Sequence, residues 1–235
     1  MSEIHNTTSK RKPSRVAFQG AHGAFSEEAA IKLLGEDIKL VPCSTFETLF
    51  TSIGNGIADL VLAPIENSLV GSIHHVYDLL CETKLVITGE VIIPISHNLI
   101  GLPGAKLTEI ETVESHPVAL AQCKKFFSDH PNLRRVPAED TAGSIANVVA
   151  SADRKRAGIA SKRAAQIYGG EILLEHLEDD EENYTRFLLL ESSDSVNQQP
   201  IDADKFSLVI RTAQDGHNIH HENSPRRHGV TRRGH

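Results

Sequence analysis

The sequence predicts an α/β fold built as two lobes, and three observations lead to this prediction. Segments typical of strands alternate with segments typical of helices along most of the chain, a pattern that favours parallel strands joined by right-handed crossovers. The run 57–63 is apolar almost without interruption, as in a strand that is covered on both faces. Around residues 94–97, a proline follows a long strand, and the chain is expected to cross there into the second lobe.

The elements follow from local patterns. The expected strands are 15–19, 57–63, 86–95, 109–114, 135–136, 157–160 and 172–174. The expected helices are 27–34, 46–53, 73–80, 118–127, one that follows Asp140 and Thr141, and one that follows Ser161. The helix at 46–53 has apolar residues at i, i+3, i+4 and i+7, and the Ser44 to Glu47 segment before it has the spacing of a capping box.

Polar residues recur where the expected strands end and helices begin. The hydroxyl residues at these junctions are Ser26, Ser68 or Ser72, Ser115, Thr141 and Ser161. One interpretation is ordinary helix capping. The other is that several helix N-termini and hydroxyls meet in a cleft between the lobes, where they would suit a small carboxylate ligand and need no metal.

Composition excludes several classes of protein. With 40% hydrophobic and 23% charged residues in 235, the chain has enough apolar residues for a large core. The net charge of −7 argues against a general nucleic-acid surface. Apolar runs are too short for a membrane span, and the first residues lack the apolar core of a secretory signal. Three widely spaced cysteines favour reduced thiols and a cytoplasmic location.

Five short motifs, in order, resemble the catalytic domain of prephenate dehydratase. They are Gly20-x-x-Gly23-x-Phe25-Ser26, Pro64-Ile65-Glu66-Asn67-Ser68, Ser115-His116-Pro117 with Gln122-Cys123, Asp140-Thr141-Ala142, and Asn183-x-Thr185-Arg186-Phe187. The resemblance implies two α/β lobes with a cleft between them, periplasmic-binding-protein-like (type II). It also implies conversion of prephenate to phenylpyruvate, water and carbon dioxide in phenylalanine biosynthesis, without a cofactor.

The resemblance also implies the site residues. Thr185, in the Thr-Arg-Phe motif, is the expected catalytic residue: a positioned hydrogen-bond donor to the departing hydroxyl rather than a strong acid. The expected substrate-binding residues are Ser26, Glu66, Asn67, Ser68, Ser115, His116, Gln122, Thr141, Asn183, Arg186 and Phe187. Arg186 either binds a carboxylate or braces the acidic run 178–182, with bracing slightly favoured. His116 either contacts the substrate or only caps a helix.

The resemblance sets the expected domain boundaries. Residues 1–14 are a disordered arm, 15–192 the catalytic domain, 193–204 a linker, 205–214 the first strand of a truncated ACT domain, and 215–235 a disordered tail rich in His and Arg. The segments that form the phenylalanine site in the family's ACT domain have no counterpart in this sequence. A homodimer is possible, as is usual in the family.

Two other functions stay open at this stage. Arogenate dehydratase performs the same reaction on the aminated substrate, and the motifs resemble that branch too. A non-catalytic module of the same fold would only close on a carboxylate ligand, although such a module has no evident use for Thr185.

Overall fold

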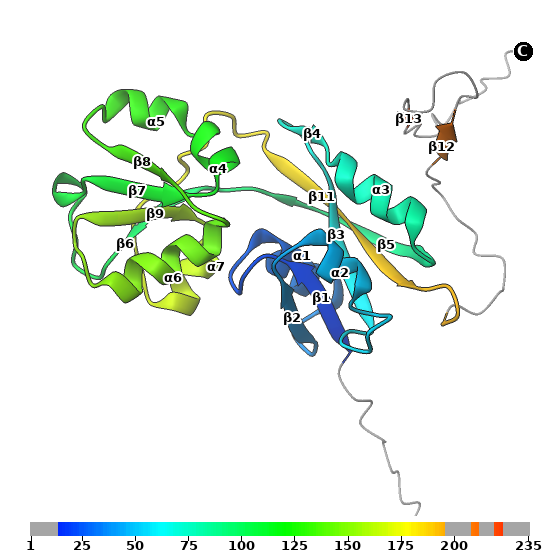
Figure 1. The fold of residues 1–235 in the computed structure, drawn as a ribbon. Helices are drawn as coiled ribbons and strands as arrows, with labels where there is room; N and C mark the ends of the chain where they lie inside the picture. Colours follow the sequence, from blue (N-terminus) through cyan, green and yellow to red (C-terminus); the bar gives the residue numbers. More distant parts are fainter. Residues whose placement is uncertain (1–13, 196–207, 212–218, 223–235) are drawn as a thin grey trace, which may run out of the picture. The chain divides into compact units, whose positions relative to one another are not determined.

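The computed structural model describes residues 14–195, 208–211 and 219–222. The chain divides into two units, Met1–Val196 and Asn197–His235. In the first unit, helices cover both faces of two separate sheets, which define a first lobe and a second lobe (Figure 1). The predicted two-lobed α/β fold is therefore confirmed.

The sheet of the first lobe has the strand order β2-β1-β3-β11-β5, with the short β4 paired to β3. Its strands are β1 (Arg15–Gln19), β2 (Lys39–Cys43), β3 (Leu60–Asn67), β4 (Gly71–Ser72), β5 (Leu85–Pro94) and β11 (Tyr184–Ser192). β1 is parallel to β2 and β3, whereas β11 runs antiparallel to both of its neighbours. β11 comes from the end of this unit, yet it lies between β3 and β5, which come from its first half.

The sheet of the second lobe has the order β10-β6-β9-β7-β8. Its strands are β6 (Asn98–Gly101), β7 (Thr112–Ser115), β8 (Arg134–Pro137), β9 (Arg156–Ala160) and β10 (Glu171–Leu174). β7 is parallel to β8 and β9, and β6 is antiparallel to β9 and β10. Both lobes thus have three parallel strands followed by one antiparallel strand that the chain forms directly after crossing between lobes, as expected for the type II arrangement.

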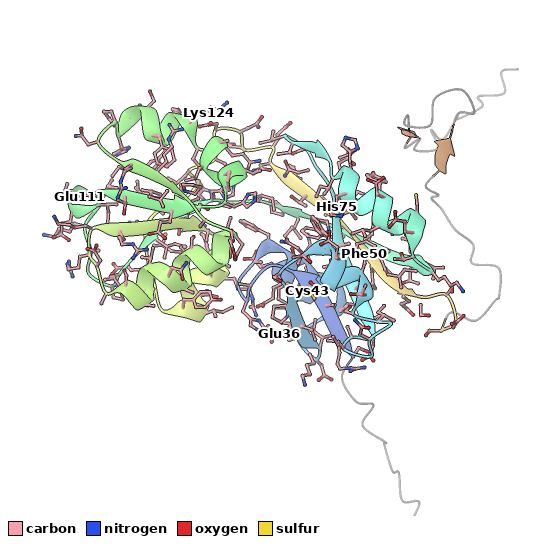
Figure 2. The ribbon with its side chains drawn as sticks, in the orientation of Figure 1. Glu36, Cys43, Phe50, His75, Glu111 and Lys124 are labelled. Carbon is pink, nitrogen blue, oxygen red and sulfur yellow. The ribbon has the colours of Figure 1, made fainter. Side chains whose placement is uncertain are left out.

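Helices cover each sheet because their apolar residues match its faces. The helices are α1 (Phe25–Leu34), α2 (Phe46–Thr51), α3 (His74–Glu82), α4 (Pro117–Ala121), α5 (Lys124–Asp129), α6 (Thr141–Ser151) and α7 (Lys162–Tyr168), with a 3-10 turn at Leu107–Glu109. In the first lobe, α2 and α3 pack on one face, around Phe50 and Cys43 (Figure 2), and α1 on the other. In the second lobe, α4 and α5 cover one face and α6 and α7 the other. No helix in the described ranges is long and apolar enough to cross a membrane.

Two local predictions differ from the structure. The capping box before α2 is formed by Thr45 and Thr48, not by Ser44 and Glu47, because the helix begins one residue later than the motif suggested. The helix expected at 118–127 is two helices, α4 and α5, interrupted at Gln122 and Cys123.

A carboxylate from a distant segment causes this interruption. Both oxygens of Asp179 accept backbone hydrogen bonds, at 2.8 Å each, from Lys124 and Lys125, and so cap the beginning of α5, where Lys124 is labelled in Figure 2. A negative charge at this position also favours a new helix N-terminus. The break leaves Gln122 at the end of α4.

The two lobes contact each other directly through the turn between β1 and α1. Phe18 and Ala24 of the first lobe share one apolar cluster with Ile100, Ile145 and Ala164 of the second. A Cβ at Gly23, whose φ is +86°, would lie 2.7 Å from the Cα of Ala164, so only glycine allows this approach.

Polar contacts reinforce the same junction. The Ser161 hydroxyl donates to the Gly23 carbonyl at 2.8 Å. The buried carboxylate of Glu27 accepts a hydrogen bond from Arg163 at 2.5 Å and lies 2.7 Å from the ring of His22. Of the hydroxyl residues predicted at strand–helix junctions, Ser161 therefore both caps α7 and joins the lobes.

In the second unit, the structure describes an antiparallel pair, β12 (Leu208–Arg211) with β13 (Ile219–Glu222). β12 lies within the stretch 205–214 that was expected to form a strand, and β13 lies within the tail expected to have no structure. Residues 1–13 of the predicted arm 1–14, most of the linker and the rest of the tail fall outside the described residues. The assignment of β12 to an ACT domain stays a prediction.

Candidate active site

The candidate site is built where β11 begins beside the end of β3. Thr185 of β11 is paired with Asn67 of β3 in the strand register. The Asn67 side-chain Nδ2 lies 3.0 Å from Thr185 Oγ1 and 2.8 Å from Asn183 Oδ1. Sheet pairing thus holds a hydroxyl against an amide, and Thr185 is only 9% exposed.

The orientation of the Asn67 amide is set by the backbone. Its Oδ1 accepts two hydrogen bonds, each 3.0 Å long, from the N–H groups of Leu69 and Val70 in the turn that follows β3. Nδ2 must therefore be the atom that faces Thr185, and Oγ1 must be the acceptor of that bond. Among the described residues, no group accepts the hydroxyl hydrogen of Thr185, so this hydrogen remains for a ligand.

The hydrogen-bond chain continues from Asn183 into the second lobe. Asn183 is buried, and its Nδ2 donates to Gln122 Oε1 at 3.1 Å. Gln122 stands at the end of α4, so this contact depends on the interruption between α4 and α5. A third residue, His97, lies 2.8 Å from the same Oε1 through its Nε2.

Ser68 supports the site from the side. Its hydroxyl donates to the Glu182 carbonyl at 2.7 Å and accepts from the Tyr184 N–H at 2.9 Å. It thereby fixes the end of the acidic loop immediately before Thr185. Asn67, Ser68, Gln122, Asn183 and Thr185 are the predicted site residues that the structure connects.

The prediction that Arg186 braces the acidic loop is wrong. Its guanidinium binds Glu90 of the neighbouring strand β5, with 2.8 Å from Nε and 2.7 Å from Nη2 to the same carboxylate oxygen. Alternation along β11 turns Arg186 away from the face of Thr185. The acidic loop is held instead by backbone donors: Glu178 accepts from the His97 N–H at 2.7 Å, and Asp179 caps α5.

Two predicted substrate contacts are core residues. Phe187 is 2% exposed and packs in the apolar cluster beneath α1, because alternation along β11 places it on the face opposite Arg186. Ser115 is fully buried at the end of β7, and its hydroxyl donates to the Ile159 carbonyl at 2.6 Å. Neither side chain is placed to touch a ligand.

Four predicted residues lie at separate positions. Glu66 is half-buried on β3, in register with Arg186. Ser26 is buried in the first turn of α1, and Thr141 begins α6. His116 caps α4 by accepting the Val118 N–H on Nδ1 at 3.2 Å, and burial lowers the pKa of its ring against a smaller opposing effect of Asp140.

A cleft between the lobes opens beside the β1–α1 turn. A cavity of about 410 Å³ has walls from both lobes, formed by Gln19, Gly20, Ala21, His22, Pro42, Ser44, Glu139, Asp140 and Tyr168. A neighbouring cavity of about 660 Å³ shares Glu139 and Asp140 and adds Glu114. Because carboxylates line these cavities, we do not place the carboxylates of a substrate there. The described residues contain no group of three His, Cys, Asp or Glu able to hold a metal ion.

The sequence reasoning missed His97. It is 2% exposed, and the edge of the Phe25 ring faces it with centroids 5.8 Å apart. The available signal was an ionisable residue at the expected crossover between lobes. Cys123 directly follows Gln122, and its thiol is buried. Burial raises the pKa of this thiol to about 12, so we assign it no chemistry.

Comparison with known proteins agrees with this arrangement. The family model described as prephenate dehydratase matches residues 16–195. The chain belongs to the prephenate dehydratase family. Arogenate dehydratase 1 of Petunia hybrida is 45% identical over 177 residues, which are 75% of this chain and 42% of that protein. This chain therefore aligns with less than half the length of that relative.

Two solved structures have the same fold as this prephenate dehydratase domain. A prephenate dehydratase from Arthrobacter aurescens in complex with L-Phe is 29% identical, with a TM-score of 0.73 over 81% of this chain and 63% of that one. GqqA, described as a novel type of quorum quenching acylase, is 33% identical, with a TM-score of 0.71 over 79% of this chain and 67% of that one.

Proposed function

We propose that the chain catalyses the decarboxylating dehydration of prephenate to phenylpyruvate. One observation carries this proposal most directly: the backbone-oriented amide of Asn67 donates to Thr185 Oγ1, which leaves the hydroxyl hydrogen of Thr185 directed at a ligand. Membership of the prephenate dehydratase family supports the same reaction. The enzyme would be a carbon–oxygen lyase of phenylalanine biosynthesis.

The reaction requires little chemistry from the protein. The ring carboxylate leaves as carbon dioxide, its bonding electrons enter the ring, and the hydroxyl on the opposite carbon departs as water after taking up one proton. Aromatisation supplies the driving force. Thr185 would donate a hydrogen bond to the departing oxygen as negative charge develops there, and a fixed donor of this kind accelerates a reaction by about 10²–10³-fold.

Arogenate is the second candidate substrate. It differs from prephenate in carrying an amino group in place of the side-chain keto group, and the name of the Petunia relative favours it. The leaving groups are the same, so Thr185 would have the same role. The difference between the substrates lies at the far end of the side chain, away from the bond that breaks.

Two other activities fit the site less well. An acylase would use Thr185 as a nucleophile, which requires a base to accept its proton. The hydrogen-bond partner of Thr185 Oγ1 in the structure is a donating amide, not a base. A purely binding module would not need the free hydroxyl hydrogen.

The test is a direct comparison of kcat/KM on prephenate and on arogenate, with product identified by mass. We expect turnover of both, with prephenate preferred. Higher kcat/KM on arogenate would change the assigned substrate but keep the reaction. Ligand binding without product from either substrate would overturn the proposed reaction.

A further inference from the structure

His97 makes a buried contact that the proposed chemistry does not use. It lies at the crossover before β6, and its Nε2 is 2.8 Å from Gln122 Oε1. Its Nδ1 is buried and has no hydrogen-bond partner in the described residues. A buried imidazole with one bonded and one unbonded nitrogen calls for an explanation, because an unpaired buried polar atom destabilises the folded state.

The hydrogen-bond chain determines which ring nitrogen carries the proton. The backbone N–H groups of Leu69 and Val70 fix Asn67 Oδ1, so Asn67 Nδ2 donates to Asn183 Oδ1. Asn183 Nδ2 must then be the atom that faces Gln122, and that neighbour must present its Oε1. An acceptor oxygen requires a donor from His97. His97 therefore carries its hydrogen on Nε2, and Nδ1 is a bare acceptor.

The surroundings of His97 favour this neutral form. Burial lowers the pKa of the ring, and this effect outweighs the opposing effects of Gln122 and Glu178. Phe25 packs against the ring on one side. Glu178 accepts from the backbone N–H of His97, and it also interacts with His176 of the same acidic loop.

The consequence for Gln122 is a fixed amide. Two donors, His97 Nε2 and Asn183 Nδ2, occupy its Oε1. The Gln122 Nε2 has no acceptor in the described part of the chain, and the side chain is half-buried rather than enclosed. Both amide hydrogens are therefore available for an anionic oxygen, such as a carboxylate, close to Thr185.

We propose that His97 is a positioning residue that holds the Gln122 amide with its N–H donors directed at a carboxylate of the substrate. Without the Nε2 donor, Asn183 alone holds the amide at 3.1 Å. The amide then rotates more readily and presents Oε1, which repels a carboxylate. Thr185 is not affected, because the backbone orients Asn67 independently. The inference rests on the proposed function for the identity of the substrate, but not for the geometry.

The test uses the full chain and four variants, each checked for folding by circular dichroism: H97F, H97Q, Q122A and H97F/Q122A. Loss of a hydrogen bond to a charged group raises KM on the order of tenfold. We expect H97F to raise the KM for prephenate by this factor with little change in kcat. H97Q should restore most of the affinity, because the glutamine amide supplies an N–H in place of Nε2. H97F should have no further effect on KM in the Q122A background.

Two results would overturn this inference. One is an equal rise in KM from H97F in the wild-type and Q122A backgrounds, and the other is a fall in kcat at unchanged KM. If H97F does not fold, Q122E decides, because the carboxylate still satisfies both donors but presents only acceptor atoms to the ligand; an unchanged KM in Q122E contradicts the proposal.

A binding measurement separates this inference from the proposed reaction. Calorimetry in the Thr185→Val background gives the dissociation constant of prephenate without turnover. Suppose that the unaltered chain does not turn prephenate over, but that its affinity for prephenate falls when His97 is replaced. This result would support the positioning role and count against the proposed reaction. Turnover with an affinity independent of His97 would do the reverse.

Discussion

The two lobes have the same strand order but use the ends of their third strands differently. In the first lobe, β3 ends in Asn67, and the neighbouring antiparallel strand brings Thr185 beside it. In the second lobe, β9 ends in Ala160, which pairs with Asn98 of the antiparallel strand β6. The Asn98 amide donates to the carbonyls of Ser96 and Ala160. The same place in the fold thus holds a hydroxyl whose hydrogen no described residue accepts in one lobe, and amide-to-carbonyl bonds within the protein in the other.

The two edges therefore differ in what their side chains contact. The second lobe follows Ala160 with Ser161, whose hydroxyl binds the Gly23 carbonyl of the first lobe. Ser161 at this edge helps to hold the lobes together, whereas Thr185 of the first lobe keeps a hydroxyl hydrogen that no described residue accepts. In the part of the chain that the structure describes, Gln122 joins the second lobe to this end of β11 through the Asn183 amide, and His97 binds the same Gln122 oxygen. Substitutions at the two edges should therefore have separable effects on turnover and on stability.

The largest effect is expected from Thr185→Val, which keeps the shape of the side chain and removes the hydroxyl. Asn67 Nδ2 retains the Tyr184 carbonyl as an acceptor at 3.1 Å, so folding should be unchanged. We expect kcat to fall by about 10²–10³-fold, measured as phenylpyruvate formation. Thr185→Ser is the control and should keep most of the activity. Near-wild-type kcat in the valine variant would remove Thr185 from the mechanism.

A smaller effect, on stability, is expected from Gly23→Ala at the junction of the lobes. The added Cβ would lie 2.7 Å from the Ala164 Cα, at a φ of +86°. We expect a loss of about 2–3 kcal/mol in the free energy of unfolding, from backbone strain together with the clash, measured by urea denaturation.

Gly56→Ala is the matched control for this variant. Gly56 also has a positive φ, +66°, but a Cβ there meets nothing within 4 Å. Backbone strain alone costs about 1–2 kcal/mol. Equal losses in the two variants would mean that the close approach of the lobes contributes nothing.

The smallest effect concerns pH and His97. Burial lowers the pKa of this histidine in the folded protein, so the unfolded chain binds a proton at a higher pH than the folded chain does. Stability from this group is therefore full above the unfolded pKa of about 6.5 and is lost as pH falls from there through the lower folded pKa. Relative to H97Q, the wild type should lose stability as the pH falls from about 7 to about 5.5. Parallel pH profiles of the two proteins would contradict this.

Local patterns in the sequence were sufficient to predict the alternating fold. The apolar run 57–63 and the apolar spacing at Phe46, Leu49 and Phe50 depend only on neighbours in the chain. They predicted a strand and a helix, but the strand is Leu60–Asn67 and includes Glu66, which was expected to follow it. The strands Lys39–Cys43 and Asn98–Gly101 were not predicted. Both are short, and proline in one and polar residues around the other hide their pattern.

The candidate site could be predicted only in part, because its contacts join distant segments. The helix break at Gln122 depends on Asp179, which lies far along the chain. Arg186 was assigned to the nearby acidic loop, but strand pairing gives it Glu90. His97 has no distinctive local motif, and its role follows from the directions of bonds between three elements. Sequence proximity therefore favoured the wrong partner for Arg186 and gave no indication of the partners of Gln122 and His97.

The turn after β3 has a consequence for how this protein can change. Leu69 and Val70 have exposed side chains, yet their peptide N–H groups set the donor and acceptor directions of the Asn67, Asn183 and Gln122 amides and, through them, of the His97 ring. Peptide groups are the same in every residue except proline, which lacks the N–H. Substitutions at these two positions can therefore change the side chain without changing the hydrogen bonds to Asn67. Proline is the one substitution that would remove an N–H donor. The hydrogen-bond directions of the site are thus set by the main chain and not by the side chains at these two positions.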